Sequence, residues 1–121
     1  FAAHRRLGNL VAVVDHNGLQ IDGAICDVCD PEDIGAKFAA FGWDVTEVDG
    51  HDLPAVTAAL TAAKAAAGER PHAIIAHTVK GKGVSFMEDQ ASWHGNAPSA
   101  DQAATALAEL DTERDAIEKE A

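Results

Sequence analysis

The chain has 121 residues, 47% of them hydrophobic and 24% charged, which excludes an intrinsically disordered protein and allows one small domain or part of a larger one. Its formal net charge of −11, without a stripe of Lys or Arg, excludes nucleic acid as a partner and disfavours anionic membranes. No apolar run approaches the ~20 residues of a membrane span, and a total of two cysteines fits a reducing cytoplasm. The first eight residues read as the end of a helix closed by Gly8, so we expect the natural N-terminus to lie upstream.

Three short apolar runs predict the strands of a parallel sheet. Residues 9–15, Asn-Leu-Val-Ala-Val-Val-Asp, are rich in β-branched side chains and are typical of a strand buried on both faces. Residues 43–48 form a less regular second strand, with Val45 and Val48 as expected core residues. Residues 72–78 form a third buried strand.

Helical patterns separate these runs. Pro31 and the acidic residues around it indicate a helix that starts near Cys29, and Gly42 ends it. Asp52 is a suitable N-cap for a second helix, which we expect to run to about Ala67 before the next glycine closes it. The expected apolar faces of these two helices are Ile34, Phe38 and Phe41, and Leu53, Val56 and Leu60.

A last helix is expected from Ala100 to about Glu120. Residues 111–121 at its end are heavily charged, and we expect them to fray into solvent. The apolar residues that fall on one side of this helix are Ala103, Leu107, Leu110 and Ile117.

The alternation of strands and helices predicts an α/β fold with three layers, α/β/α, and a doubly wound, mostly parallel sheet. We expect residues 1–121 to be one portion of such a domain. Ligands of these folds bind beyond the carboxyl ends of the strands. The loops 15–23 and 78–95 follow the first and third strands, so functional residues are expected in them.

Cys26 and Cys29 form a single C-x-x-C pair. A structural zinc site needs four ligands, usually from two such pairs, and the chain has no second pair. Asp27 and Asp30 next to the cysteines oppose the lowered thiol pKa that a redox site requires. We therefore expect two reduced cysteines in a loop.

Both loops contain candidate ligand-binding or catalytic residues. Asn17 offers an amide oxygen beside Gly18 and could help bind Mg²⁺ or Ca²⁺, although Asn-Gly is equally a plain turn signal. Lys80 and Lys82 lie in a Gly-rich stretch that suits a phosphate but lacks P-loop spacing, so a solvated loop stays an alternative. His94, which follows a Trp, is a candidate proton donor or acceptor, or a packed loop residue. The histidines that we expect to be structural are His4, His51, His72 and His77.

Taken together, these segments resemble one family. Residues 9–23, which end in Asp-His-Asn-Gly-Leu-Gln-Ile-Asp-Gly, resemble the second half of the thiamine-diphosphate motif of transketolases. Residues 78–95, from Thr-Val-Lys-Gly-Lys-Gly to Trp-His-Gly, resemble the family's loop that ends in Trp-His-Gly. Val-Asp-Gly-His-Asp at 48–52 fits between them, and the likeness extends from Leu7 to Leu110. The second loop is most similar to the N-terminal subunit of split bacterial-type transketolases.

This resemblance implies roles for five residues. Asn17 and the backbone carbonyl of Leu19 correspond to metal ligands, and Asn17 also touches the cofactor's diphosphate. Ile21 corresponds to a position near the thiazolium ring, and Lys80 to a cofactor-contacting lysine. His94 corresponds to a histidine close to both the diphosphate and the sugar substrate, so it is the catalytic candidate. The implied cofactors are thiamine diphosphate and Mg²⁺, which Ca²⁺ could replace.

The resemblance implies transfer of a two-carbon ketol unit from a ketose phosphate to an aldose phosphate, as in the pentose phosphate pathway. The cofactor would act as electron sink, and His94 would donate hydrogen bonds to substrate oxygens. The implied partners are sugar-phosphate substrates and a pyrimidine-binding domain or C-terminal subunit, in a dimer or heterotetramer.

Two parts of the family pattern do not occur in these 121 residues. The family motif begins with Gly-Asp-Gly, whose Asp is the anionic metal ligand, and the glutamate that activates the cofactor belongs to the pyrimidine-binding domain. We therefore expect the chain alone to bind cofactor weakly and to be inactive. Two alternatives stay open: a deoxyxylulose-phosphate synthase or dehydrogenase E1-like subunit, and a non-catalytic assembly fragment that uses an exposed sheet edge.

Overall fold

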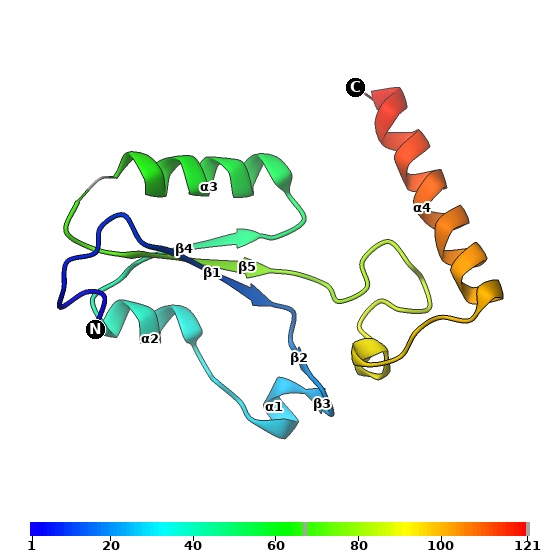
Figure 1. The fold of residues 1–121 in the computed structure, drawn as a ribbon, viewed down its shortest axis with the longest axis horizontal. Coiled ribbons are helices and arrows are strands. Elements are labelled where there is room, and N and C mark those ends of the chain that lie inside the picture. Colours follow the sequence, from blue (N-terminus) through cyan, green and yellow to red (C-terminus); the bar gives the residue numbers. More distant parts are fainter. Residues whose placement is uncertain (67, 121) are drawn as a thin grey trace. The chain divides into compact units, whose positions relative to one another are not determined.

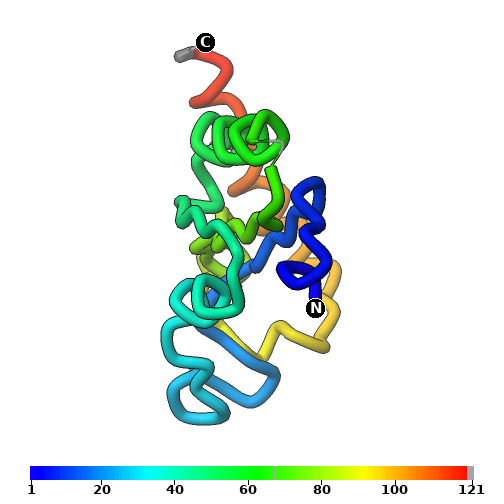
Figure 2. The backbone as a smooth tube through the Cα atoms, turned by 90° about the vertical axis from the view of Figure 1, so that its left-hand side faces the viewer, coloured from blue at the N-terminus to red at the C-terminus, as the bar shows by residue number. Residues whose placement is uncertain are grey.

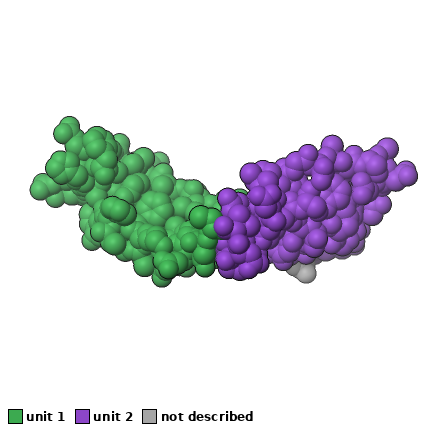
Figure 3. Space-filling model, turned by 90° about the horizontal axis from the view of Figure 1, so that it is seen from below, with its two compact units in different colours: residues 1–17, 29–78 green, residues 18–28, 79–121 purple. Residues whose placement is uncertain are grey.

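The computed structural model describes residues 1–66 and 68–120, so Ala67, the expected end of the second helix, lies outside the described residues. The chain divides into two compact units, coloured separately in Figure 3. Unit 1 comprises Phe1–Asn17 and Cys29–Thr78, and unit 2 comprises Gly18–Val28 and Val79–Ala121. In the described part of the chain, no helix is both long and apolar enough to cross a membrane.

Unit 1 is built on a three-stranded parallel sheet with the order β1–β5–β4 (Figure 1). The strands are β1 (Val11–His16), β4 (Asp44–Asp49) and β5 (His72–His77). The central strand β5 pairs in register with both neighbours, so His16, His77 and Asp49 lie side by side at the carboxyl edge. The three strands expected from the apolar runs are all present.

Two helices cover the two faces of this sheet. Helix α2 (Ile34–Ala40) and helix α3 (Leu53–Ala65) both pack on β4 and β5. Figures 1 and 2 show α3 on one face and α2 on the opposite face. The predicted three-layer α/β/α class with a parallel sheet is therefore confirmed within unit 1.

The core of unit 1 is centred on β5, because strands flank it on both sides and helices cover both of its faces. Ile74 is 1% exposed, and its strand neighbours from Ala73 to Ala76 are also buried. The expectation that β1 is buried on both faces is wrong, since Val13 is 58% exposed. β1 is an edge strand, and the two helices pack on β4 and β5 instead.

Helix α2 begins later than the sequence indicated. Its N-cap is Asp33, whose side chain accepts a 2.7 Å hydrogen bond from the backbone N–H three residues on. Glu32 has a left-handed backbone, with φ of 51°, so a helix cannot run through it from Cys29. The predicted end is confirmed at Gly42, where φ is 83°, although Phe41 is exposed rather than part of the core.

Helix α3 has the predicted cap but a different buried face. The side chain of Asp52 accepts a 3.0 Å hydrogen bond from a backbone N–H of the first turn, as a good N-cap does. The buried residues are Ala59 and Ala63, whereas the expected Leu53 and Leu60 are exposed.

The first run of hydrogen-bonded turns ends at Arg6, and a separate turn covers residues 8–9. Arg6 takes the left-handed conformation, with φ of 53°, and the N–H of Leu7 reaches back 3.1 Å to the carbonyl of Ala2. Glycine is needed at position 8 for a steric reason, because a Cβ atom there would collide with the carbonyl oxygen of Gly68.

Unit 2 contains short elements that the sequence did not predict. Its first segment folds into a two-stranded antiparallel hairpin followed by one helical turn: β2 (Leu19–Gln20), β3 (Gly23–Ala24) and α1 (Ile25–Val28). Its second segment contains the 3-10 helix η1 (Ala91–His94) and the long helix α4 (Ala100–Glu120). The bounds of α4 agree with those expected.

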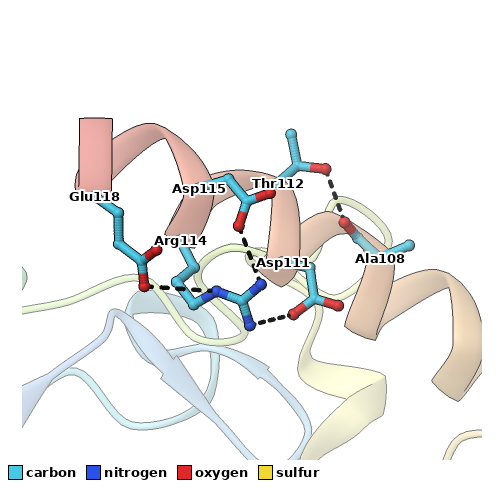
Figure 4. A network of polar contacts seen from close by, with 6 residues as sticks. All are labelled: Ala108, Asp111, Thr112, Arg114, Asp115 and Glu118. Carbon is cyan, nitrogen blue, oxygen red and sulfur yellow. Dashed lines mark hydrogen bonds and ion pairs between the residues drawn. The ribbon is translucent and has the colours of Figure 1, made fainter. Parts of the chain in front are cut away.

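The charged end of α4 carries a cluster of ion pairs (Figure 4). Arg114 lies 2.8 Å from Asp111, 3.0 Å from Asp115 and 3.9 Å from Glu118. All four side chains are exposed, so these pairs add little stability. The helix continues to Glu120, and fraying of residues 111–121 stays a prediction.

Candidate functional site

The carboxyl edge of the sheet fixes the points at which the two functional loops leave it. The N–H of Thr78 donates to the carbonyl of His16 at 3.2 Å, and the N–H of Gly50 donates to that of His77 at 2.7 Å. The hydroxyl of Thr78 donates to Asp15 Oδ1 at 2.5 Å. Residues just after β1 and β5 therefore start from defined positions.

The first loop begins with the expected metal-binding segment. Asn17 is half-buried in unit 1. In unit 2, Gly18 takes the left-handed conformation, with φ of 71°, and its carbonyl accepts a 3.0 Å hydrogen bond from the N–H of Ile25. Leu19 is half-buried in the hairpin, and Ile21 is 61% exposed at the hairpin turn. A Gly is favoured at position 18 because other residues adopt this backbone conformation only at a cost.

The second loop, residues 78–95, folds back on itself. The carbonyl of Lys80 accepts a 3.0 Å hydrogen bond from the N–H of Asp89, which closes the loop. Gly81 and Gly83 have positive φ values of 74° and 88°. A Cβ atom on Gly81 would also lie 2.6 Å from the carbonyl oxygen of Met87. The two glycines of the Lys-Gly-Lys-Gly run are thus needed for this backbone path.

The two lysines of this loop differ in their surroundings. Lys82 Nζ lies 3.4 Å from Glu88 Oε1, and the same oxygen accepts a 3.0 Å hydrogen bond from the N–H of Gly83. The described residues provide no ion pair for Lys80, which is half-buried. Lys80 is therefore the better candidate for contact with an anionic ligand, and a joint role for Lys82 is less favoured.

Helix α4 holds the middle of the same loop. The backbone N–H and the hydroxyl of Ser85 each donate to Glu109, with distances of 2.7 Å. These hydrogen bonds, the backbone one first, lower the pKa of Glu109 by stabilising its ionised form. An ionised Glu109 thus ties the loop to α4.

His94 lies at the end of η1 and is exposed. The preceding Trp93 anchors this turn: its ring packs on Phe86 with a centroid distance of 5.5 Å, and its Nε1–H donates to the Phe86 carbonyl at 3.0 Å. The chain after His94 is open, because a Cβ atom on Gly95 would meet nothing within 4 Å. His94 is thus held at its backbone while its side chain stays accessible.

The five residues expected to contact the cofactor fall in both units. Asn17 belongs to unit 1, and the other four belong to unit 2. Their convergence on one ligand therefore stays a prediction. The four in unit 2 are Leu19, Ile21, Lys80 and His94.

A histidine pair that the sequence did not predict lies on the carboxyl edge of unit 1. His16 Nδ1 is 3.3 Å from His77 Nδ1, and His77 Nε2 is 2.8 Å from Glu47 Oε2. We expected His77 to be structural. Each histidine is the last residue of an apolar strand, and this shared position is a signal that could have revealed the pair once the strand register was known.

The family model that describes the thiamine diphosphate binding domain of transketolase matches residues 1–117. This chain belongs to the transketolase family. The match covers nearly the whole chain and confirms the resemblance carried by the loops 15–23 and 78–95.

Curated transketolase relatives are considerably longer than this chain. An apulose-4-phosphate transketolase subunit of Phocaeicola vulgatus is 39% identical over 115 residues, which are 95% of this chain and 41% of that protein. The 6-deoxy-6-sulfo-D-fructose transketolase subunit SqwG of a Clostridium species is 39% identical over 113 residues, which are 93% of this chain and 41% of that protein. The chain thus spans less than half the length of these relatives.

Solved transketolase structures share the fold. A transketolase from Campylobacter jejuni matches with a TM-score of 0.79 and 28% identity, over 87% of this chain and 16% of that one. A transketolase variant from Pichia stipitis matches with a TM-score of 0.78 and 33% identity, over 87% of this chain and 15% of that one. These relatives give no support to a deoxyxylulose-phosphate synthase, an E1-like subunit or a non-catalytic fragment.

Asn17 in unit 1 and Leu19 in unit 2 carry oxygen donors of the kind that a metal–diphosphate site uses. The Asn17 amide and the Leu19 carbonyl are neutral oxygens, which Mg²⁺ and Ca²⁺ accept as ligands. Gly18 between them leaves open space, since a Cβ atom there would meet nothing within 4 Å. Among the described residues, no three His, Cys, Asp or Glu side chains gather to hold a metal ion.

Proposed function

We propose that this chain is part of a thiamine-diphosphate- and Mg²⁺-dependent transketolase that moves a two-carbon ketol unit from a ketose phosphate to an aldose phosphate. The observation that carries the proposal is the family match over residues 1–117. Two relatives of similar sequence are named transketolase subunits, and their names give apulose 4-phosphate and 6-deoxy-6-sulfo-D-fructose as the sugars. These names support a phosphorylated or similarly anionic sugar as substrate.

Asn17 and Leu19 are the proposed metal ligands. Asn17 would give its amide oxygen to the ion, and Leu19 its backbone carbonyl. The left-handed Gly18 supports this assignment, because it sets the direction of the backbone between the two ligands without a side chain in the way. Mg²⁺ held in this manner would offset the charge of a diphosphate, with Ca²⁺ as a possible substitute.

Lys80, Ile21 and His94 are the proposed contacts to the organic groups. The Lys80 ammonium would attract the diphosphate, and the exposed Ile21 side chain would pack near the thiazolium ring. When bound, thiamine diphosphate supplies the carbon nucleophile and the electron sink of the reaction. His94 would bind substrate oxygens and donate a hydrogen bond where negative charge develops.

The complete assembly would include a pyrimidine-binding domain or C-terminal subunit. The names of two relatives contain the word subunit, which supports a second polypeptide. The chain holds no Gly-Asp-Gly, so the anionic metal ligand must come from another segment or chain. We propose a cytoplasmic dimer or heterotetramer in which this portion alone is inactive.

Asn17→Ala tests the metal site in the complete protein. Loss of one hydrogen-bonding contact to charged groups, worth about 1.5–3 kcal/mol, should weaken Mg²⁺ and thiamine diphosphate together by about 10–150-fold. Isothermal titration calorimetry measures both affinities. Asn9→Ala is a matched control, because Asn9 precedes β1 at the other end of the strand and should leave both unchanged. Equal cofactor affinity in the two variants would remove Asn17 from the site.

His94→Ala tests the catalytic assignment separately. Removal of one donor to developing charge should lower kcat by about 10²–10³-fold, with a much smaller change in cofactor affinity. A coupled assay with sugar phosphates gives kcat, and calorimetry gives the affinity. His4→Ala serves as a control, since His4 is an exposed histidine in the N-terminal turns. Wild-type turnover in His94→Ala would contradict the role.

A further inference from the structure

The histidine pair at the carboxyl edge of unit 1 has no place in the proposed reaction. His16 ends β1 and His77 ends β5, and the two residues are direct partners in the parallel register. Their Nδ1 atoms are 3.3 Å apart, and their rings meet edge to face with a centroid distance of 5.3 Å. This contact is a hydrogen bond between the two rings, with one Nδ1–H as the donor, so the paired strands already hold the two nitrogens close together.

This separation matches a metal chelate. Zn²⁺ binds imidazole nitrogen at about 2.0–2.1 Å, so two nitrogens on one tetrahedral ion lie about 3.3 Å apart. The observed distance between the two Nδ1 atoms is 3.3 Å. Because strand pairing sets the positions of the two residues, little chain ordering is needed when an ion binds.

Glu47 orients His77, one of the two histidines of the pair. Its Oε2 accepts a hydrogen bond from His77 Nε2–H at 2.8 Å, which leaves the lone pair of His77 on Nδ1. A carboxylate in this position behind a histidine orients the ring and makes it a better metal ligand. Gly35 permits the arrangement, because a Cβ atom there would lie only 2.9 Å from Glu47 Oε1.

The surroundings favour a cation. The pair borders a hollow of about 210 Å³ that Glu32, Asp33 and Glu47 also line. Glu32 is paired with Lys37 at 2.9 Å, which offsets its charge, and Asp33 caps α2, so neither carboxylate serves as a ligand. His77 and Glu47 side chains are about half exposed, so water can complete the coordination shell.

We propose that His16 and His77 bind one divalent transition-metal ion of the Zn²⁺ type, oriented by Glu47 and completed by water. Imidazole nitrogens select Zn²⁺, Ni²⁺ or Cu²⁺, whereas the amide and carbonyl oxygens proposed for the cofactor metal select Mg²⁺ or Ca²⁺. The two sites are therefore chemically distinct. With only two protein ligands, this site is weaker than a structural zinc site.

Calorimetric titration of the full chain with Zn²⁺ tests the proposal, in a background that carries Cys26→Ser and Cys29→Ser. Both cysteines are exposed and free, and their removal prevents the thiols from capturing the metal. One Zn²⁺ per chain is expected, and millimolar Mg²⁺ should not displace it. Absence of binding, or displacement by Mg²⁺, would overturn the proposal. No cofactor is added, so the result does not depend on the proposed transketolase activity.

Substitutions locate the bound ion. His16→Asn and His77→Asn should each weaken Zn²⁺ binding by at least about tenfold, and Glu47→Gln by about tenfold. The control His4→Asn should bind Zn²⁺ like the starting protein. Binding that is unchanged in both pair variants would refute the site. Circular dichroism melts accompany each variant to establish that it is folded.

A second measurement needs no substitution at the pair. The chain has six histidines, and nitrogen NMR spectra resolve the two ring nitrogens of each. Zn²⁺ should move the Nδ1 resonances of His16 and His77 first, at substoichiometric metal. Initial shifts at other histidines, with this pair unaffected, would also overturn the proposal.

Discussion

Gly81 is the position in the second loop where one added methyl group should have the largest effect. Its backbone is left-handed, with φ of 74°, and a Cβ atom there would approach the Met87 carbonyl carbon to 2.7 Å and its oxygen to 2.6 Å. These atoms belong to the backbone and cannot rotate away as a side chain can. Gly81→Ala therefore forces the loop to shift.

The cost has two parts. A residue with a Cβ atom loses about 1–2 kcal/mol in the left-handed conformation. Overpacking against neighbouring atoms adds about 1–3 kcal/mol. The reduced freedom of the unfolded chain returns about 0.4–1 kcal/mol. The net loss for Gly81→Ala is thus about 1–5 kcal/mol, a large share of the about 5–15 kcal/mol of a typical domain.

Two other glycines separate these contributions. A Cβ atom on Gly95 would meet nothing within 4 Å, and its φ of −130° suits any residue, so Gly95→Ala should be neutral or slightly stabilising. Gly18 has a positive φ of 71° but equally open surroundings. Gly18→Ala should therefore cost only about 0–1.6 kcal/mol after the same gain from the unfolded chain.

Urea unfolding followed by tryptophan fluorescence measures these effects. The chain has two tryptophans, and Trp43→Phe leaves Trp93 as the single reporter. Trp93 packs on Phe86 within the loop, so its emission changes when the loop opens. If Gly81→Ala and Gly95→Ala unfold at the same urea concentration, the close approach to Met87 does not govern the loop, and the reasoning fails.

Three further predictions concern stability. Ile74→Ala should destabilise unit 1 by about 2–5 kcal/mol in urea, because Ile74 is 1% exposed, whereas the exposed Val13→Ala should cost much less. Asp52→Ala should remove the α3 cap and cost about 1 kcal/mol, while Asp52→Asn should cost little, as thermal melts can show. Because the folded-state pKa of Glu109 is lowered, its link to the loop is fully present above the pKa of the unfolded state and is lost as the pH falls through the folded value. The Ser85 amide resonance should report that transition, and Glu109→Gln should abolish it.

The sheet was readable from the sequence because its strands are short apolar runs with clear boundaries. The runs at 9–15 and 72–78 predicted β1 and β5, and the Asp52 cap predicted the start of α3. What the runs did not reveal was the strand order. A buried pattern in β1 suggested full burial, but β5 lies in the centre and β1 at the edge.

The misplaced start of α2 and the missed hairpin have a common physical origin. Pro31 near two acidic residues is a common helix start, yet the left-handed Glu32 moved the cap to Asp33. The β2–β3 hairpin has only two residues per strand, too few for a period to be recognised. Local backbone choices of this kind depend on tertiary contacts more than on residue pattern.

For the candidate site, the sequence identified the loops better than the neighbours of each residue. Gly18, Gly81 and Gly83 have positive φ values, a backbone conformation that favours glycine. The ion pair between Lys82 and Glu88 could not be predicted from the sequence, since it depends on how the loop folds back. Likewise, the contact between His16 and His77 joins residues 61 positions apart.

The position of β5 has a consequence for synthesis of the protein. It is the middle strand of the sheet, yet it is the last of the three to leave the ribosome. At about 5–20 residues per second, β1 and β4 wait a second or longer before His72–His77 arrives between them. During that interval both emerging strands present unpaired amides and carbonyls to any other nascent chain. Slow translation of the segment after Asp49 should therefore increase aggregation of the newborn protein.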